Sequence, residues 1–425
     1  MKRRNNEMLI LITFVLLILV GTAALYLSQM GRGTLSFVDA LFTATSAVCV
    51  TGLVTVPVSA FTPVGQLLIL LFIQLGAIGI MTLTASFILF FRGELNFEDR
   101  MIAGKLSLAP TSGNVESVVK VVLKYTLAFE ALGFLLLCVG FKLDGFSWTD
   151  SSYHALFHAV SAFCNAGFST FDTSLQEVNN GVKLTVMALI IQGGLGYYVL
   201  YDLMEIAKKK DRLTVHSKIV LTATCVFIVL GALVLLVTEK GECALIDCFF
   251  QSVTARTAGF STIDLNRFHA AGLLLLIVLM IIGAAPGSTG GGMKLTTFWV
   301  VAAAAYNTLR GSGSMVIFKR QLLREDVFRA FAVFFLYLFI LFSGAMLLLH
   351  YEGGNFLEVL FEITSALGTV GLSLGLTGKL GVSGKVIVII WMLIGRIGPA
   401  ILVLLLLREK KMRRVEYPVE KILMG

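Results

Sequence analysis

Long apolar runs alternate with short polar segments along the whole chain. A charge-free run of about 18 residues or more can span about 30 Å of hydrocarbon as a helix. Several runs meet this requirement: residues 8–27, 64–91, 184–201, 219–238, 330–349 and 386–395 continued by 397–407. The pattern predicts an all-α polytopic membrane protein. We expect the first run, which follows three basic residues, to be a retained helix and not a cleaved signal peptide.

Four short stretches, each centred on a glycine, repeat one pattern. They read FTATSAVCVTGLVT from Phe42, FHAVSAFCNAGFST from Phe157, FFQSVTARTAGFST from Phe249 and FEITSALGTVGLSL from Phe361. Aligned on their glycines, all have Phe ten residues earlier, and three have Ser-Ala where the third has Val253-Thr254. A second glycine follows at Gly76, Gly194, Gly283 and Gly395. The spacing predicts four repeats with boundaries at 1–105, 106–212, 213–320 and 321–425.

Each predicted repeat consists of an apolar helix, a short segment with the glycine pattern, and a second apolar helix. The short segments cover roughly 36–49, 149–164, 243–256 and 355–368, about 14 residues each, which is too short to cross a membrane. Two of them open with helix-capping signals, Ser36 before Asp39 and Asn355 before Glu358. We therefore expect eight transmembrane helices and four re-entrant pore helices around a central pore.

The basic residues predict the orientation. With the amino terminus inside and alternating spans, 24 of the 34 lysines and arginines fall in inside segments, eight (Arg256 among them) fall outside, and Lys294 and Arg396 fall within spans. The positive-inside rule then places both termini in the cytoplasm. The net charge of +8 follows from this topology and gives no reason to expect nucleic-acid binding.

The glycine stretches predict a cation path. Non-helical backbone at membrane depth must be buried in protein or line a watery cavity. Four carbonyl-bearing segments that meet around one axis can replace the hydration shell of a cation, and pore helices whose C-terminal ends face the centre favour positive charge there. The alternative is that the glycines are only small-residue helix contacts.

Other candidate chemistry is weak. The six cysteines lack CxxC spacing, so we expect packing residues, with no disulfide and no transition-metal site. His154 and His158 have helical i, i+4 spacing but no third ligand, so we expect a pair on the surface of a pore helix.

The fourfold plan, together with the closing stretch YPVEKILMG, resembles the Trk/Ktr/HKT superfamily of potassium transporters, and the Ktr membrane subunit most. The resemblance implies a selectivity filter that binds K⁺ at Val50, Thr51, Gly52, Asn165, Ala166, Gly167, Thr257, Ala258, Gly259, Thr369, Val370 and Gly371. These triplets depart from the TVGYG of simple channels. A serine at the position of Gly52 goes with sodium preference in plant relatives, so glycine favours potassium.

The resemblance also implies partners. It suggests a homodimer in the lipid membrane, docked on a cytoplasmic ring of nucleotide-binding RCK regulatory subunits. It implies K⁺ as the transported ion, Na⁺ as a candidate activating ion and no covalently bound cofactor.

The second helix of the third repeat is interrupted by GAAPGSTGGGMK, residues 283–294. Proline and clustered glycines disfavour a helix, and a nucleotide-binding P-loop is excluded because no strand precedes the segment. We expect an intramembrane gate formed by Gly283, Pro286, Gly287, Gly290, Gly291, Gly292 and Lys294, with a simple helix kink as the alternative. Arg396, inside the last span, is expected to repel cations or to pair with carbonyls of this loop.

Two other function classes remain open. A secondary transporter of another cation or a small solute, Na⁺-coupled or Na⁺-selective, could use broken helices around a midplane site. An intramembrane enzyme would need a catalytic constellation, and the sequence has no HExxH, no Gly-x-Ser-x-Gly and no paired membrane aspartates. We therefore do not expect an enzyme.

Overall fold

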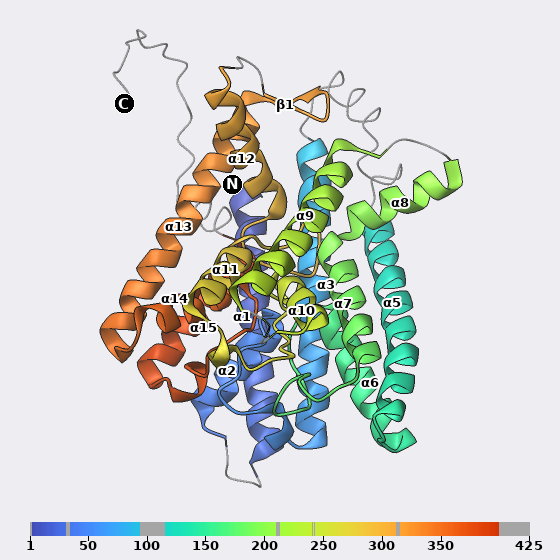
Figure 1. The fold of residues 1–425 in the computed structure, drawn as a ribbon, viewed down its shortest axis with the longest axis vertical. Helices are drawn as coiled ribbons and strands as arrows, with labels where there is room; N and C mark the ends of the chain where they lie inside the picture. The colour runs from blue at the N-terminus through green and yellow to red at the C-terminus, as the bar shows by residue number, and fades with distance from the viewer. Residues whose placement is uncertain are drawn as a thin grey trace.

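The computed structural model describes residues 2–30, 35–93, 115–209, 213–239, 241, 243–311 and 315–398. Within these residues, four helices are long and apolar enough to cross a membrane. They are α1 (Lys2–Gln29), α5 (Val115–Leu143), α9 (Val215–Thr238) and α13 (Arg324–Glu352), and each opens one predicted repeat (Figure 1). The prediction of a helical protein with several apolar helices is confirmed, whereas the count of eight spans stays a prediction.

A short helix follows each long one. These are α2 (Phe37–Val48), α6 (Trp148–Phe163), α10 (Leu245–Thr254) and α14 (Phe356–Gly368), close to the four segments expected to be short helices. The side chains of Ser36, Ser147 and Asn355 cap α2, α6 and α14 by accepting a backbone N–H of the first turn. Ser147 was not among the predicted caps, and α10 has no side-chain cap.

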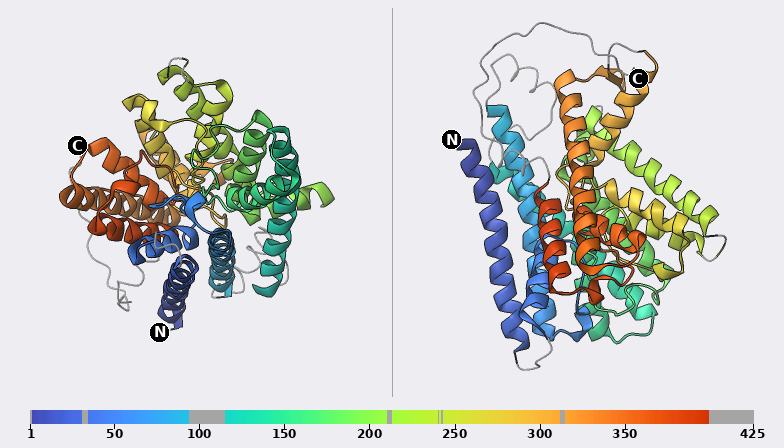
Figure 2. Two further views of the ribbon diagram at one scale, coloured as in Figure 1. Left: turned by 90° about the horizontal axis from the view of Figure 1, so that it is seen from below. Right: turned by 90° about the vertical axis from the view of Figure 1, so that its left-hand side faces the viewer.

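The repeats close with the returning helices α3 (Pro63–Gly93), α7 (Asn180–Leu195), α11 (Ala270–Ile281) and α15 (Val382–Ile397). In three repeats a 3₁₀ turn stands between the glycine and this helix: η1 (Val58–Ala60), η2 (Leu265–Arg267) and η3 (Thr377–Lys379). Seen from below, the blue, green, yellow and orange parts of the chain follow one another around a centre where loops meet (Figure 2).

Two returning helices are interrupted. The predicted break in the third repeat is present, because α11 ends at Ile281 and α12 (Leu295–Leu309) begins after an irregular segment. The expectation of one helix over 184–201 is wrong: α7 and α8 (Tyr197–Lys209) meet at 95°. Gly196 at this corner has φ +81°, and a Cβ there would lie 2.8 Å from the Pro286 carbonyl oxygen. The loop of the third repeat thus occupies the place where a straight α7 would continue. The predicted run 397–407 lies outside the described residues from 399 on.

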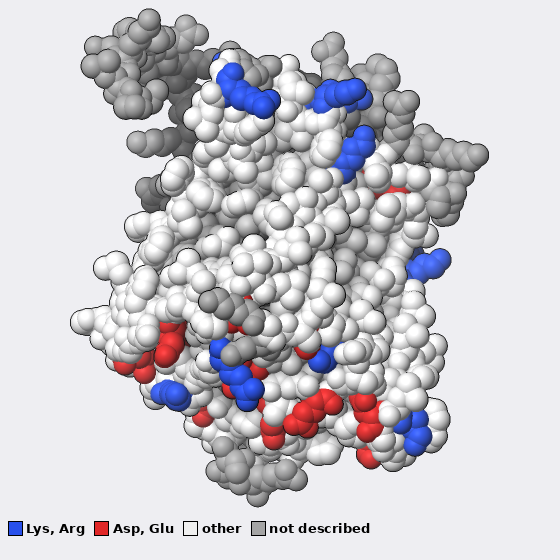
Figure 3. Space-filling model, viewed as in Figure 1, with Lys and Arg blue, Asp and Glu red and all other residues white. Residues whose placement is uncertain are grey.

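On one face of the molecule, the charged residues are unevenly distributed along the long axis (Figure 3). On the face shown in Figure 3, lysines and arginines gather near the hairpin β1 (Val316–Ile317) and β2 (Arg320–Gln321), while acidic residues gather at the opposite end with some lysines and arginines. This distribution agrees with the positive-inside argument. The cytoplasmic placement of the termini stays a prediction.

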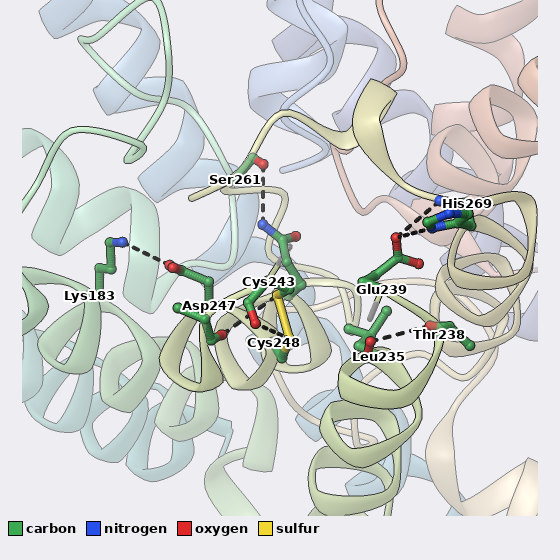
Figure 4. The surroundings of a disulfide bond; sticks show 11 residues. Lys183, Leu235, Thr238, Glu239, Cys243, Asp247, Cys248, Ser261 and His269 are labelled. Atoms are coloured by element: carbon green, nitrogen blue, oxygen red, sulfur yellow. Dashed lines mark hydrogen bonds and ion pairs between the residues drawn. A yellow bond between two sulfur atoms is a disulfide. The ribbon is translucent and has the colours of Figure 1, made fainter. Parts of the chain in front are cut away.

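The expectation that no cysteines pair is wrong at one place. Cys243 and Cys248 form a disulfide across the start of α10, with their Cα atoms 6.0 Å apart (Figure 4). The expectation rested on the absence of CxxC motifs, but the turn into α10 brings together two cysteines that are five residues apart. Cys49, Cys138, Cys164 and Cys225 are free.

Candidate ion pore

The segments that follow the four short helices meet in a closed ring. A Cβ built on Gly52 would lie 2.4 Å from the carbonyl oxygen of Ala166, in the next repeat. A Cβ built on each of the other three glycines would also lie close to a carbonyl oxygen of the next repeat. The distances are 2.6 Å from Gly167 to Ala258, 2.2 Å from Gly259 to Val370 and 2.3 Å from Gly371 to Thr51. Such close approach leaves no room for a side chain, so all four positions require glycine. The structure therefore brings the predicted filter segments together in the order of the repeats.

The backbone of the four segments also repeats. The glycines have φ values of 93°, 69°, 81° and 96°. Two residues earlier, Val50, Asn165, Thr257 and Thr369 have φ values of 55°, 57°, 82° and 49°. Side-chain-bearing residues rarely adopt this conformation, and backbone strain of this kind clusters at functional sites. The Ser46 and Ser365 hydroxyls support it by accepting the N–H of Gly52 and Gly371, each at 3.0 Å.

The third repeat departs from the glycine-based alignment by one residue. Phe42, Phe157 and Phe361 are buried, but in α10 it is Phe250 that is fully buried, and the predicted equivalent Phe249 is only partly so. In the other repeats the residue before the glycine donates to the carbonyl five residues earlier, whereas in the third Gly259 itself donates to Thr254. The matching of Phe249 is therefore wrong, because in the third repeat the buried Phe lies nine residues before the glycine, one fewer than in the other repeats.

A pocket of about 230 Å³ opens on the side of the residues that follow the glycines. All four glycines line it, as do the carboxylates Asp172 and Asp264. Carboxylates in a concave mouth raise the local concentration of cations. The pocket therefore has the shape and charge of an entrance to the ring.

The irregular segment after α11 packs against side chains of the predicted filter, two residues before the glycines. A Cβ on Gly290 would lie 2.2 Å from Thr257 Oγ1, and one on Gly291 would lie 2.3 Å from Thr369 Oγ1. The segment is pinned to itself, since Gly283 N–H donates to Met293 at 2.9 Å and Lys294 Nζ donates to Gly290 at 2.8 Å. Of the predicted gate residues, Gly290 and Gly291 thus lie directly beside the ring, whereas Gly287 packs against Tyr197 of the second repeat.

Arg396 connects three parts of the molecule from within α15. Its side chain is buried, with 3% of the residue exposed. One terminal nitrogen donates to the carbonyl of Thr289 in the loop, and the other donates to the carbonyl of Gly76 in α3 at 2.9 Å. Of the two predicted roles for Arg396, the geometry shows the pairing with a loop carbonyl.

Sequence reasoning misjudged two residues near the ring. A Cβ on Gly193 would lie 1.9 Å from the Phe163 carbonyl oxygen at the end of α6, whereas the predicted repeat glycine, Gly194, meets nothing closer than 3.4 Å. Arg256, counted among the outside charges, is buried and donates to Thr224 of α9 through both terminal nitrogens. The position of Arg256, one residue before a predicted filter triplet, could have indicated that it is buried beside the ring.

Comparison with known proteins decides the family. The chain matches the TrkH family, described as a cation transport protein, over residues 2–416. The chain belongs to this family. The Trk/Ktr resemblance that the repeats indicated is thereby confirmed.

Two relatives show how far the likeness extends. The chain is 35% identical over 427 residues to Ktr system potassium uptake protein B of Bacillus subtilis, covering 97% of this chain and 95% of the relative. It is 35% identical over 446 residues to potassium/sodium uptake protein NtpJ of Enterococcus hirae, covering 100% and 98%. The structure of the potassium transporter TrkH from Vibrio parahaemolyticus matches with a TM-score of 0.77 at 19% identity, over 95% of this chain and 85% of that one. That match shows a shared fold.

Proposed function

We propose that this TrkH-family protein takes up K⁺ across the cytoplasmic membrane through the glycine ring. In this proposal each repeat contributes two spans and one re-entrant helix, giving eight spans with both termini in the cytoplasm. The observation that carries it is the closed ring, in which each filter glycine admits a carbonyl of the next repeat. The named functions of the two relatives support K⁺ as the ion.

Selection follows from the ring carbonyls. The carbonyl oxygens of Thr51, Ala166, Ala258 and Val370 face the neighbouring glycines, and together they replace the water around a dehydrating cation. The C-terminal ends of the short helices add partial negative charge. The acidic mouth concentrates cations at one side.

Gating follows from the loop on the other side. Gly290 and Gly291 fill the space beside Thr257 and Thr369, so an ion that leaves the ring requires the loop to move. Arg396 holds the loop by its Thr289 carbonyl and places a fixed positive charge below the ring. Both effects raise the barrier to a cation when the loop is in place.

Regulation is proposed to come from outside the chain. The relative from Bacillus subtilis is named as one component of a Ktr system, which supports a separate cytoplasmic subunit. We extend this to a homodimer on an RCK ring that binds a nucleotide.

The test is ⁸⁶Rb⁺ uptake into liposomes that hold the purified chain, competed with K⁺ and then with Na⁺. The variant Gly52→Ser places a side chain at φ +93°, where a Cβ lies 2.4 Å from the Ala166 oxygen. We expect wild-type uptake to be blocked by K⁺ and not by Na⁺, and the variant to lose that preference.

A matched control is Gly378→Ser. A Cβ at Gly378 meets no atom within 4 Å, so the K⁺/Na⁺ preference should stay at the wild-type value. Equal competition by both ions in the wild type would instead favour the alternative function, a transporter of both K⁺ and Na⁺ such as the name of the Enterococcus relative describes. An unchanged preference in Gly52→Ser would contradict the filter assignment.

A further inference from the structure

Three of the four short helices hold a polar side chain against the segment that follows the filter glycine. Once the third repeat is corrected by one residue, the residue after the buried Phe is Thr43, His158, Gln251 or Glu362. The residue two after the glycine is Val54, Ser169, Ser261 or Ser373. These positions are hydrogen-bonded in the second, third and fourth repeats, at 2.9 Å (His158–Ser169), 3.2 Å (Gln251–Ser261) and 2.7 Å (Glu362–Ser373). Figure 4 shows Ser261 at such a bond.

The fourth repeat has the fullest set of contacts. Glu362 is fully buried, and the hydroxyls of Ser373 and Thr377 donate to its two carboxylate oxygens. Ser373 Oγ also accepts the N–H of Gly375 at 3.0 Å. One carboxylate therefore fixes both ends of the segment that leads away from Gly371.

The second repeat uses an imidazole for the same purpose. His158 was expected on a helix surface but is fully buried, which corrects that expectation. Its Nδ1 lies 2.8 Å from the His154 carbonyl oxygen, so Nδ1 carries the hydrogen and Nε2 accepts from the Ser169 hydroxyl at 2.9 Å. As in the fourth repeat, the serine accepts the N–H two residues on, here that of Phe171 at 3.1 Å.

The first repeat shows what the position is like without this bond. Thr43 is fully buried and its hydroxyl has no hydrogen-bond partner within the structure as described. Val54 offers no polar side chain in return. The first repeat therefore packs at this position without a hydrogen bond. Burying the larger polar groups of the other repeats costs free energy, so we infer that they serve a function besides packing.

We propose that His158, Gln251 and Glu362 are positioning residues that hold the backbone beyond the filter glycines and thereby sustain K⁺ over Na⁺ preference. Discrimination by a carbonyl ring depends on how firmly the ring keeps its dimensions. The three contacts act two residues from the glycines, close enough to set the orientation of the ring carbonyls. This inference rests on the proposed K⁺ uptake function.

The test compares the removal of hydroxyl groups in the fourth repeat, where Glu362 is hydrogen-bonded, with their removal in the first repeat, where Thr43 is not. The double variant Ser373→Ala, Thr377→Val removes both donors to Glu362, and Glu362→Gln retains an acceptor for one of them. Thr43→Val makes the same isosteric change where no bond exists. In ⁸⁶Rb⁺ uptake with Na⁺ competition, we expect the double variant to lose about fivefold or more in K⁺/Na⁺ preference, which corresponds to one buried hydrogen bond or more. Glu362→Gln should fall between it and the wild type, and Thr43→Val should match the wild type.

A second readout does not depend on transport. Because a bound ion stabilises the folded state, the K⁺ concentration that raises the Tm of the purified protein should increase in the double variant and stay unchanged in Thr43→Val. Wild-type preference in the double variant, or equal losses in both, would overturn the inference alone. A wild type that transports Rb⁺ without preferring K⁺ to Na⁺ would overturn the proposed function as well.

Discussion

The returning helices of the first and third repeats begin from the same pattern and end in different structures. α3 runs unbroken past Gly76, where a Cβ would lie 2.0 Å from the Val48 carbonyl oxygen at the end of its own short helix. In the third repeat, Gly283 instead faces the loop, with a Cβ 2.5 Å from the Gly291 oxygen. The repeat glycine thus packs against the end of a short helix in the first repeat, whereas in the third repeat it packs against the loop.

The difference shows how one repeat is adapted without loss of the ring. The second and fourth repeats follow the first: Gly193 and Gly395 seat the ends of α6 and α14, with Cβ distances of 1.9 and 2.0 Å to the Phe163 and Leu367 oxygens. We call Gly76, Gly193 and Gly395 the scaffold glycines, because at each of them a returning helix packs closely against the end of a short helix. The third repeat gives up its continuous helix, and the freed residues lie beside the ring.

The largest expected effect comes from a side chain at a scaffold glycine. Gly193→Ala places a Cβ 1.9 Å from a backbone oxygen that cannot move without shifting α6. We expect the free energy of unfolding to fall by about 3 kcal/mol, the upper range for overpacking. Thermal unfolding of the purified protein in detergent measures this.

The neighbouring Gly194→Ala is the matched control. Its Cβ would meet Asn165 Nδ2 at an acceptable 3.4 Å, and alanine favours a helix more than glycine does. The Tm should stay at or above the wild-type value. If Gly194→Ala lowers the Tm more than Gly193→Ala does, the assignment of Gly193 as the scaffold glycine is wrong. Gly194, the glycine predicted from the sequence, would then hold that role.

The second prediction addresses the third repeat. Deleting Gly290 to Gly292 removes the backbone that packs beside Thr257 and Thr369, so we expect ⁸⁶Rb⁺ flux into liposomes to rise about tenfold, a barrier change of about 1.4 kcal/mol. A monodisperse protein with unchanged K⁺/Na⁺ preference shows that the ring has survived. Unchanged or abolished flux in such a protein would contradict the proposed gating role of the loop.

Most of the difference between the first and third repeats could be predicted from the sequence, but the geometry of the ring could not. The four short helices were predictable from the repeated glycine pattern and the length of each segment, with capping signals at two of them. The break in the third repeat was predictable from Pro286 and its glycines. The ring was expected because helix packing alone does not require a glycine at the same position after a short helix in all four repeats. Its closure, in which each glycine faces the next repeat, depends on the packing of distant segments, and no local pattern shows that.

Other features were missed for physical reasons that differ. The spacing of the third repeat, which is one residue shorter between the buried Phe and the glycine, cannot be seen in the sequence because Phe249 and Phe250 are adjacent and identical. The bend at Gly196 depends on the third-repeat loop, which occupies the path of α7. His158 was expected at a surface because helical spacing does not show which face of α6 is covered. Of these, the bend at Gly196 depends on a contact between repeats, whereas His158 is bonded to His154 and Ser169 of its own repeat.

The smallest expected effect tests how Arg396 links the two kinds of repeat. Its bonds to Gly76 and Thr289 tie the α3 scaffold to the loop. Arg396→Gln removes both the charge and this bridge, and we expect flux to rise about fivefold, since two carbonyl bonds of about 0.5 kcal/mol net each are lost, a barrier change of about 1 kcal/mol. Arg396→Lys separates the causes, because lysine keeps the charge but lacks the planar fork that reaches two carbonyls at once. Raised flux in both variants would show that the bridge holds the loop. Wild-type flux in Arg396→Lys alone would show that the positive charge below the ring sets the barrier, and the loop would then be held chiefly by its own contacts with Thr257 and Thr369.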